Sequence, residues 1–170
     1  RSRKLGQTWA ESVAGRMELH YSPGRTWEAT ARALIGLLTL GDTLDIGSGD
    51  GVLAELISGH ARSIVCMDIS AKVLGAARER LRGTRHMHFC QADMHAVPFA
   101  PASFDHIFVM HALPYTRDPE TVVRGAARLL RPGGHLIIAT LAPHQHEATV
   151  QAFDHQNQGI SAAELRRWLD

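Results

Sequence analysis

The chain alternates between two hydrophobic patterns along most of its length. Short apolar runs rich in β-branched residues recur between stretches whose apolar residues repeat every three to four positions. The first pattern is typical of buried strands and the second of amphipathic helices. Their repeated alternation predicts an α/β domain, a Rossmann-like doubly wound fold whose mostly parallel sheet carries helices on both faces.

The predicted elements follow one another in a regular order. Strands are predicted over 43–46, 63–67, 86–91, 104–110 and 135–141, and helices over 5–20, 26–38, 52–57, 71–81, 119–130, 147–156 and 161–169. Right-handed crossovers with a reversal beside the first strand predict the spatial order 3-2-1-4-5, with a ligand cleft at the carboxyl ends of the strands. A single domain is therefore expected, with N-terminal helices over 1–40, a cofactor-binding core over 41–142 and a helical segment over 143–170.

Composition narrows the class of protein. The 170 residues are 45% hydrophobic and carry a formal net charge of +1, so no overall field attracts nucleic acid. No apolar run approaches the roughly 20 residues of a membrane span. Cys66 and Cys90 lie in predicted strands and are expected to be buried thiols. We therefore expect a cytoplasmic domain that binds neither membrane nor nucleic acid.

A glycine loop follows the first predicted strand and precedes a helix. Gly47, Gly49 and Gly51 allow a tight turn and let a ligand approach the backbone. The simplest alternative is a plain strand-to-helix turn. The Gly-x-Gly-x-Gly spacing differs from the Gly-x-Gly-x-x-Gly of dinucleotide-binding loops. The loop therefore predicts a nucleotide-type ligand other than a dinucleotide.

Acidic residues suggest which ligand this is. Asp45 and Asp50 flank the loop, where they would repel a pyrophosphate and suit a cation such as S-adenosylmethionine. Asp68 ends the second strand about 20 residues later, where an acid can accept ribose hydroxyls; its alternative role, a helix cap, is better filled by Ser70. Asp93 follows the third strand and is either an acceptor for an adenine amino group or a turn residue.

Five segments together resemble the ordered motifs of class I S-adenosylmethionine-dependent methyltransferases. They are Asp45–Gly51, Met67–Ser70, Gln91–Phe99, Phe104–Asp105 and Leu129–Gly134, and the resemblance spans residues 43–141. It implies an enzyme with S-adenosylmethionine as cofactor. The implied cofactor-binding residues are Asp45, Gly47, Ser48, Gly49 and Gly51 for the methionine part, Asp68 for the ribose, Ile69, Asp93 and Met94 for the adenine, and Met110 with His111 near the reacting methyl.

His111 is the candidate catalytic base, because its ordinary pKa suits proton transfer near neutral pH. Tyr115 lies just beyond it as a second candidate catalytic residue, and both have the alternative role of ordinary loop polarity. The pairs His144/His146 and His86/His88 are too sparse for a structural zinc site, so no metal is expected.

The flanking regions add two expectations. The segment from Trp9 to Trp27 resembles the lead-in to methyltransferase domains fused behind ArsR-type winged-helix regulators, and it adds Tyr21 and Arg25 to the expected cofactor-binding residues. The family closes its sheet with two further strands, and none is predicted after 135–141. We therefore expect a C-terminally truncated core whose exposed fifth strand either pairs with another copy or leaves the domain less stable than a chain extended past Asp170.

The expected activity is methyl transfer to a small-molecule acceptor. The alternative is a non-catalytic S-adenosylmethionine-binding module of a transcriptional regulator. A nicotinamide-dependent oxidoreductase is disfavoured by the spacing and charge of the glycine loop.

Overall fold

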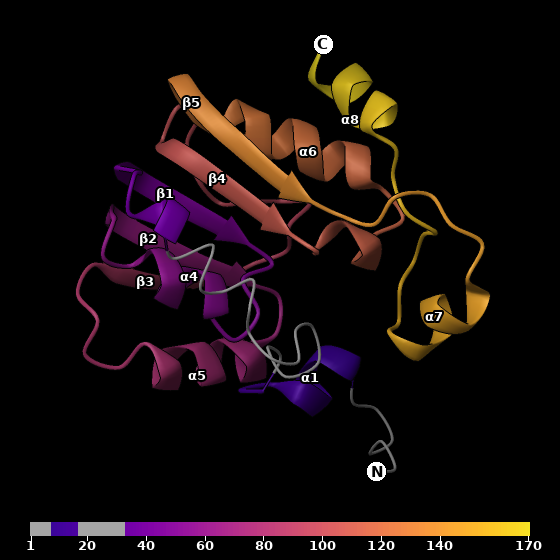
Figure 1. The fold of residues 1–170 in the computed structure, drawn as a ribbon, viewed down its shortest axis with the longest axis horizontal. Coiled ribbons are helices and arrows are strands. Elements are labelled where there is room, and N and C mark those ends of the chain that lie inside the picture. The colour runs from indigo at the N-terminus through magenta and orange to yellow at the C-terminus, as the bar shows by residue number, and fades with distance from the viewer. Residues whose placement is uncertain (1–7, 17–32) are drawn as a thin grey trace.

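The structure of the protein is a computed structural model that describes residues 8–16 and 33–170. It contains a five-stranded parallel sheet, formed by β1 (Leu40–Ile46), β2 (Ala61–Asp68), β3 (Met87–Gln91), β4 (Phe104–Met110) and β5 (Leu130–Ala139). The strand order is β3-β2-β1-β4-β5, which confirms the predicted order (Figure 1). β1 is central, so the glycine loop that follows it lies beside the reversal of strand order.

The helices cover the sheet in two groups. They are α1 (Trp9–Val13), α4 (Val52–Ile57), α5 (Ala71–Arg80), α6 (Pro119–Arg128), α7 (Glu147–Ala152) and α8 (Ala162–Leu169), with a 3-10 helix η1 at Leu113–Tyr115. One core cluster joins β4 to α6 and α8 through residues such as Ile107, Val122 and Trp168. A second joins β2 to α4 and α5 through Ile64 and Leu74, among others. Figure 1 shows α6 and α8 along β4 and β5, and α5 near β3.

Side-chain caps fix where the helices begin. The Asp118 side chain accepts a hydrogen bond from the N–H of Thr121 at 3.1 Å, with Pro119 in the first turn. Ser70 caps α5 in the same way, by accepting from the N–H of Val73. Both starts were expected from the sequence, because Ser and Asp caps satisfy N–H groups that have no partner within the helix.

The start of β5 differs from the sequence prediction. The segment after α6 was expected to be a turn leading to a strand over 135–141, but β5 runs from Leu130 to Ala139 with a register irregularity opposite β4. The Arg131 side chain is held by Asp105 at 2.9 Å. A Cβ at Gly134 would lie 2.8 Å from the carbonyl oxygen of Asp105, so only glycine fits there. The Pro-Gly-Gly segment is therefore a bulge within the strand.

The C-terminal segment turns back along the sheet edge. α7 ends at Ala152, four residues earlier than expected, and Asp154 follows with a positive φ of 60°. The N–H of Ile160 donates to the carbonyl of Leu141 at 2.8 Å, and α8 then packs on α6. Within residues 8–16 and 33–170, no strand pairs with the outer edge of β5.

The N-terminal helices are shorter where they are described. The helix expected over 5–20 spans only Trp9–Val13 in the described part, and Gly15 follows with a φ of 81°. Of the helix expected over 26–38, residues 33–35 form a helical turn. Residues 5–7 and 17–20 of the first prediction and 26–32 of the second lie outside the described ranges.

Candidate functional site

The glycine loop has a fixed conformation at the carboxyl edge of the sheet. Gly47, Gly49 and Gly51 have positive φ angles of 69°, 58° and 83°, a backbone region that other residues rarely adopt. The N–H groups of Gly47 and Ser48 donate to the carbonyl of Met67 at 2.8 and 2.9 Å. The loop is therefore held against the end of β2.

The same loop touches the segment that follows β4. A Cβ atom at Gly47 would lie 2.6 Å from the Cβ of Ala112. Position 47 therefore excludes a side chain for two reasons, its φ angle and the contact with Ala112. This contact brings the expected cofactor loop and the loop of His111 together.

Asp45 is an acid in the interior of β1, and only 2% of its surface is exposed. Its Oδ2 atom is buried without a hydrogen-bond partner from the described residues. Burial, together with the negative charge of Asp68, raises the pKa of Asp45 to about 7. Because a buried carboxylate without a cation is costly, Asp45 favours a ligand that brings a positive charge.

Asp68 lies at the end of β2, as expected for a ribose-binding acid. The N–H of Gly49 donates to its Oδ2 at 3.1 Å and the N–H of Ser70 to its Oδ1 at 2.9 Å. Burial raises the pKa of the Asp68 carboxyl, and the charge of Glu11 acts in the same direction. Each carboxylate oxygen has two acceptor positions, so Asp68 keeps capacity for ribose hydroxyls.

Glu11 is a site residue that the sequence reasoning missed. It lies in α1, and its Oε1 accepts a hydrogen bond from the hydroxyl of Ser70 at 3.2 Å. Glu11 and Thr8 form a capping box, whose Thr-x-x-Glu pattern is visible in the sequence. That pattern predicts a helix start, but it carries no signal that the helix lies beside Asp68.

Asp50 does not have the role expected for it. Its Oδ2 lies 3.3 Å from Nη2 of Arg80 in α5, and its carbonyl accepts from Nε of Arg80 at 3.0 Å. The charge of Asp50 is thus compensated within the protein, so it adds little to the attraction of a cationic ligand. The argument from charge therefore stays a prediction for Asp45, whereas Arg80 compensates the charge of Asp50.

The residues expected around the adenine lie at the ends of the neighbouring strands β2 and β3. Ile69 is 68% exposed, which leaves an apolar surface at this edge. Met94 is half-buried and packs against the core. The Asp93 carboxylate accepts hydrogen bonds from the N–H and from Nδ1 of His95, at 2.9 and 2.6 Å, and these bonds lower the pKa of Asp93.

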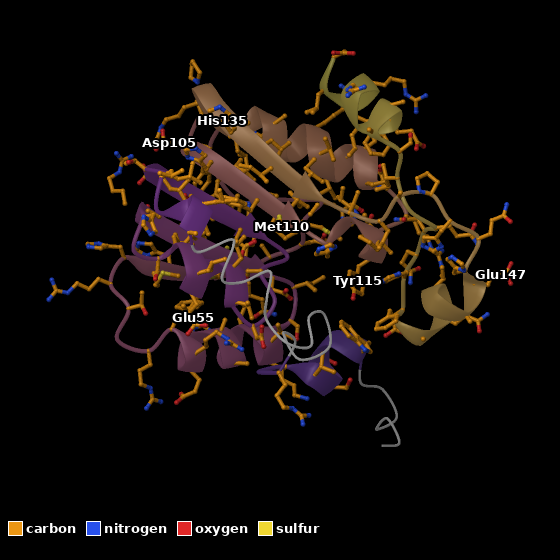
Figure 2. All side chains as sticks on the ribbon, in the orientation of Figure 1. Glu55, Asp105, Met110, Tyr115, His135 and Glu147 are labelled. Carbon is orange, nitrogen blue, oxygen red and sulfur yellow. The ribbon has the colours of Figure 1, made fainter. Side chains whose placement is uncertain are left out.

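The two candidate catalytic residues come after β4, whose last residue is Met110 (Figure 2). His111 has a positive φ of 56°, and its N–H donates to the carbonyl of Ala139 at 2.7 Å, which fixes its backbone between β4 and β5. Partial desolvation lowers the pKa of His111, so the imidazole is neutral near pH 7 and able to accept a proton. Tyr115 lies in η1, at the same edge of the sheet.

Aromatic side chains from three segments meet beside Tyr115. Tyr115 and His155 lie edge to face with ring centroids 5.2 Å apart, Phe153 stacks with His155 at 5.8 Å, and Trp9 of α1 lies edge to face with Phe153 at 4.9 Å. We call Trp9, Tyr115, Phe153 and His155 the aromatic group. The sequence reasoning missed it because the contacts depend on the turn that ends α7.

Other expected residues and features can be placed only in part. Tyr21 and Arg25 lie outside the described residues. His144 and His146 stack on each other at 5.5 Å. In the described ranges, no group of three or more His, Cys, Asp or Glu side chains could hold a metal ion, and no helix has the length and apolar character needed to cross a membrane.

The residues that the structure brings together fit S-adenosylmethionine. The buried Oδ2 of Asp45 lacks a partner in the described chain, which suits a ligand with positive charge. Asp68 and Asp93 provide acceptors at adjacent strand ends, and Ile69 provides an apolar surface beside them. Gly47, Ser48 and Gly49 are partly exposed beside these groups, and the two glycines carry no side chain that would block a ligand.

Comparison with known families agrees with this geometry. The family described as "Methyltransferase domain" matches residues 44–138, more than half of the chain. The matched range begins in β1 and ends in β5, so it includes the glycine loop, Asp68, Asp93 and His111.

Two relatives are methyltransferases of quinone biosynthesis. The ubiquinone/menaquinone biosynthesis C-methyltransferase UbiE of Cellvibrio japonicus (strain Ueda107) is 31% identical over 137 residues, which cover 76% of this chain and 55% of the relative. The ubiquinone biosynthesis O-methyltransferase of Paracidovorax citrulli (strain AAC00-1) is 32% identical over 101 residues, covering 58% and 42%. The chain therefore spans about half the length of the curated relatives it matches.

A solved structure shows the same fold. The N-methyltransferase NodS from Bradyrhizobium japonicum WM9, in complex with S-adenosyl-L-homocysteine, superposes with a TM-score of 0.74 at 22% identity and covers 94% of this chain and 80% of NodS. These proteins are methyltransferases, so they give no support to the expected ArsR-type fusion or to a regulatory module. From its family match, its sheet order and its glycine loop, the chain belongs to the methyltransferase domain family, the class I S-adenosylmethionine-dependent methyltransferases.

Proposed function

We propose that this chain catalyses methyl transfer from S-adenosylmethionine to a small-molecule acceptor. The observation that carries the proposal is the rigid glycine loop beside Asp45 and Asp68, whose pKa values are both raised. S-adenosylmethionine supplies an electrophilic methyl group on a sulfonium, which is already activated for direct displacement. The protein therefore has to bind, align the reactants and exclude water.

The cofactor-binding roles follow the order of the strands. In this proposal the backbone of Gly47–Gly51, including Ser48, holds the methionine part, and Asp45 stabilises its positive charge. Asp68 accepts from the ribose hydroxyls. Ile69 and Met94 flank the adenine, and Asp93 accepts from its amino group. The exposure of Ile69 and the half-exposed Asp93 carboxylate support these assignments.

The acceptor side is assigned to the loop after β4. His111 takes the proton that the nucleophile loses, since its lowered pKa keeps it neutral. Met110 lies next to it, where the methyl group would be transferred. Tyr115 helps to orient the acceptor, which its position in η1 beside His155 supports.

The acceptor class we propose is a small ring compound of the quinone-precursor type. Two observations support it. The aromatic group gathers around Tyr115, which follows His111 in the loop after β4, and aromatic faces bind planar rings well. The relatives from Cellvibrio japonicus and Paracidovorax citrulli are named for methylation in quinone biosynthesis.

Two further expectations belong to the proposal. The free thiols Cys66 and Cys90 suit the reducing cytoplasm. Self-association through the outer edge of β5 is expected, since no strand of the described residues pairs with it. Sedimentation velocity at increasing protein concentration tests the second expectation.

The deciding experiment has two steps. Calorimetric titration should show binding of S-adenosylmethionine and S-adenosylhomocysteine and no measurable binding of NAD. Transfer of labelled methyl from S-adenosylmethionine is then measured on hydroxylated benzenes and reduced quinones, with His111→Gln as the variant. We expect this variant to lose turnover by about 100-fold, the lower range for a positioned base, and to keep its affinity for S-adenosylhomocysteine. Tighter binding of NAD, or binding without transfer to any acceptor, would contradict the proposal.

A further inference from the structure

We propose that His95 is a positioning residue, which holds Asp93 in place for the adenine and connects the cofactor side of the site to the acceptor side. The inference rests on the proposed function, in which Asp93 binds the adenine amino group. Oδ1 of Asp93 accepts from the N–H of His95 at 2.9 Å and from its Nδ1 at 2.6 Å. On the other side of the ring, Nε2 lies 2.6 Å from Oγ1 of Thr116.

The direction of these hydrogen bonds follows from Thr116. Its Oγ1 already accepts from the N–H of Asp118 at 2.8 Å. Thr116 is only 3% exposed, so its one hydroxyl hydrogen needs a partner within the protein. It donates to Nε2 of His95, which leaves the ring proton on Nδ1. His95 therefore donates to Asp93, and the chain Thr116–His95–Asp93 has a single direction.

Asp93 needs such a support, because its side chain is 50% exposed. Oδ1 is occupied by His95, whereas Oδ2 receives no hydrogen bond from the described residues. An exposed carboxylate loses rotational freedom when a ligand binds it, and this costs part of the affinity. His95 orders Asp93 in advance, with Oδ2 left as the acceptor for the ligand.

The acceptor side of the connection runs through the backbone of Thr116. Its carbonyl accepts from Nδ2 of Asn157 at 2.9 Å, and the same amide donates to the carbonyl of Leu113 at 2.8 Å. Asn157 belongs to the segment that carries His155, and Leu113 begins η1, which carries Tyr115. His95 thus joins the loop after β3 to the two segments that carry Tyr115 and His155.

A double-mutant cycle on the full chain tests the inference, with S-adenosylhomocysteine as the probe in calorimetry. We expect His95→Ala and Asp93→Ala each to weaken binding about three- to tenfold, as for one immobilised side chain. In the Asp93→Ala background, His95→Ala should add less than about twofold, because His95 acts through Asp93. His88→Ala, an exposed histidine in β3, is the control and should bind as the wild type does.

Two conservative variants separate the two sides of the ring. The amide N–H of His95→Asn can replace Nδ1 and should restore binding to within about twofold of wild type. His95→Gln places its amide near Nε2, toward Thr116, and should not restore it. Because both variants keep a hydrogen-bonding side chain, they remain informative if His95→Ala unfolds, which melting curves will show.

The outcomes distinguish this inference from the proposed function. Additive losses in the cycle, wild-type affinity in folded His95→Ala, or rescue by His95→Gln and not by His95→Asn would overturn the role of His95 alone. A wild-type chain that does not bind S-adenosylhomocysteine would overturn the proposed function and this inference with it. Imidazole nitrogen NMR should find the proton of His95 on Nδ1; a proton on Nε2 alone would contradict the stated direction.

Discussion

The two ends of the sheet treat their acidic residues in opposite ways. At the amino ends of the strands, Asp42 and Asp105 both pair with Arg131, at 3.0 and 2.9 Å. Hydrogen bonds from Arg62 to Asp42 and from the N–H of Asp42 to Asp105, together with the charges of Arg62 and Arg131, lower the pKa values of both acids. At the carboxyl ends, Asp45 and Asp68 have no ion pair with any described residue, and the pKa of each is raised. Figure 2 shows the two ends, with Asp105 at one and Met110 and Tyr115 at the other.

The difference separates a structural end from a functional end. At the amino ends, Asp42 of β1 and Asp105 of β4 contact Arg62 of β2 and Arg131 of β5. Each of these four charges therefore has an opposite charge beside it. A fold gains nothing from leaving Asp45 buried without a cation, so its presence indicates a ligand that supplies one. The comparison predicts that only changes at the carboxyl ends alter binding, whereas changes at the amino ends alter stability and leave binding unchanged.

The largest effect is expected for Asp45→Asn. Burial raises the pKa of Asp45 from an ordinary 3.8 to about 7 in the folded protein. Its ionisation therefore costs stability as the pH rises between these two values, and the cost is constant above them. The unfolding free energy of the variant relative to wild type should therefore increase by about 3 kcal/mol from pH 5 to pH 8. Urea unfolding at both pH values measures this. If the two proteins show the same pH dependence, a partner within the protein must compensate the charge of Asp45.

A second large effect is expected for Gly47→Ala. The new Cβ would meet Ala112 at 2.6 Å and occupy a φ of 69°, so we expect a loss of about 2–3 kcal/mol. Gly83→Ala is the matched control, because its φ is 82° but nothing lies within 4 Å, and it should cost about 1 kcal/mol. Adding Ala112→Gly should restore the part due to the contact. Equal losses at positions 47 and 83 would show that the contact with Ala112 has no effect.

A smaller effect is expected for Asp68→Ala. Loss of two charge-assisted hydrogen bonds to the ribose should weaken binding of S-adenosylhomocysteine at least about tenfold, or about 1.4 kcal/mol. Asp68→Asn keeps an acceptor for the N–H of Gly49 or Ser70, so it controls for damage to the loop. Calorimetry measures both variants. Unchanged affinity in Asp68→Ala would reduce Asp68 to a turn residue.

The smallest effect is expected for Asp105→Ala at the amino ends. The variant loses the acceptor for the N–H of Asp42 and for Arg131, so we expect about 1 kcal/mol less stability near pH 7. The difference should shrink as the pH falls through the lowered pKa of Asp105, because the protonated wild type loses the same interactions. Binding of S-adenosylhomocysteine should stay the same. A loss of affinity here would break the separation between the two ends.

The sequence predicts the fold well where the signal is local. The helix starts at Ser70 and Asp118 follow from patterns within a few residues. The sheet order follows from such local strand and helix patterns once the crossovers are right-handed. The bulge in β5 could not be predicted in this way, because it depends on Arg131 meeting Asp105 across two strands. The early end of α7 likewise depends on contacts of the following turn, where Trp9 donates to Asp154.

The site shows the same division. The positions of Gly47, Asp68 and Asp93 at strand ends can be derived from spacing in the sequence. The partner of Asp50 could not, because Arg80 comes from a separate helix and cancels a charge that the sequence leaves open. Glu11 and the aromatic group were missed for the same physical reason, since they reach the site only when distant segments pack.

The central claim is that Asp45 is an acid whose compensation comes from the ligand. Carbon NMR of the labelled Asp45 carboxyl, followed across pH with and without saturating S-adenosylmethionine, tests it most directly. We predict a pKa of about 7 in the free protein and a decrease of at least about one unit with the ligand, because a nearby positive charge favours the carboxylate. A free-state pKa near 4, or a raised pKa that S-adenosylmethionine leaves unchanged, would contradict the claim.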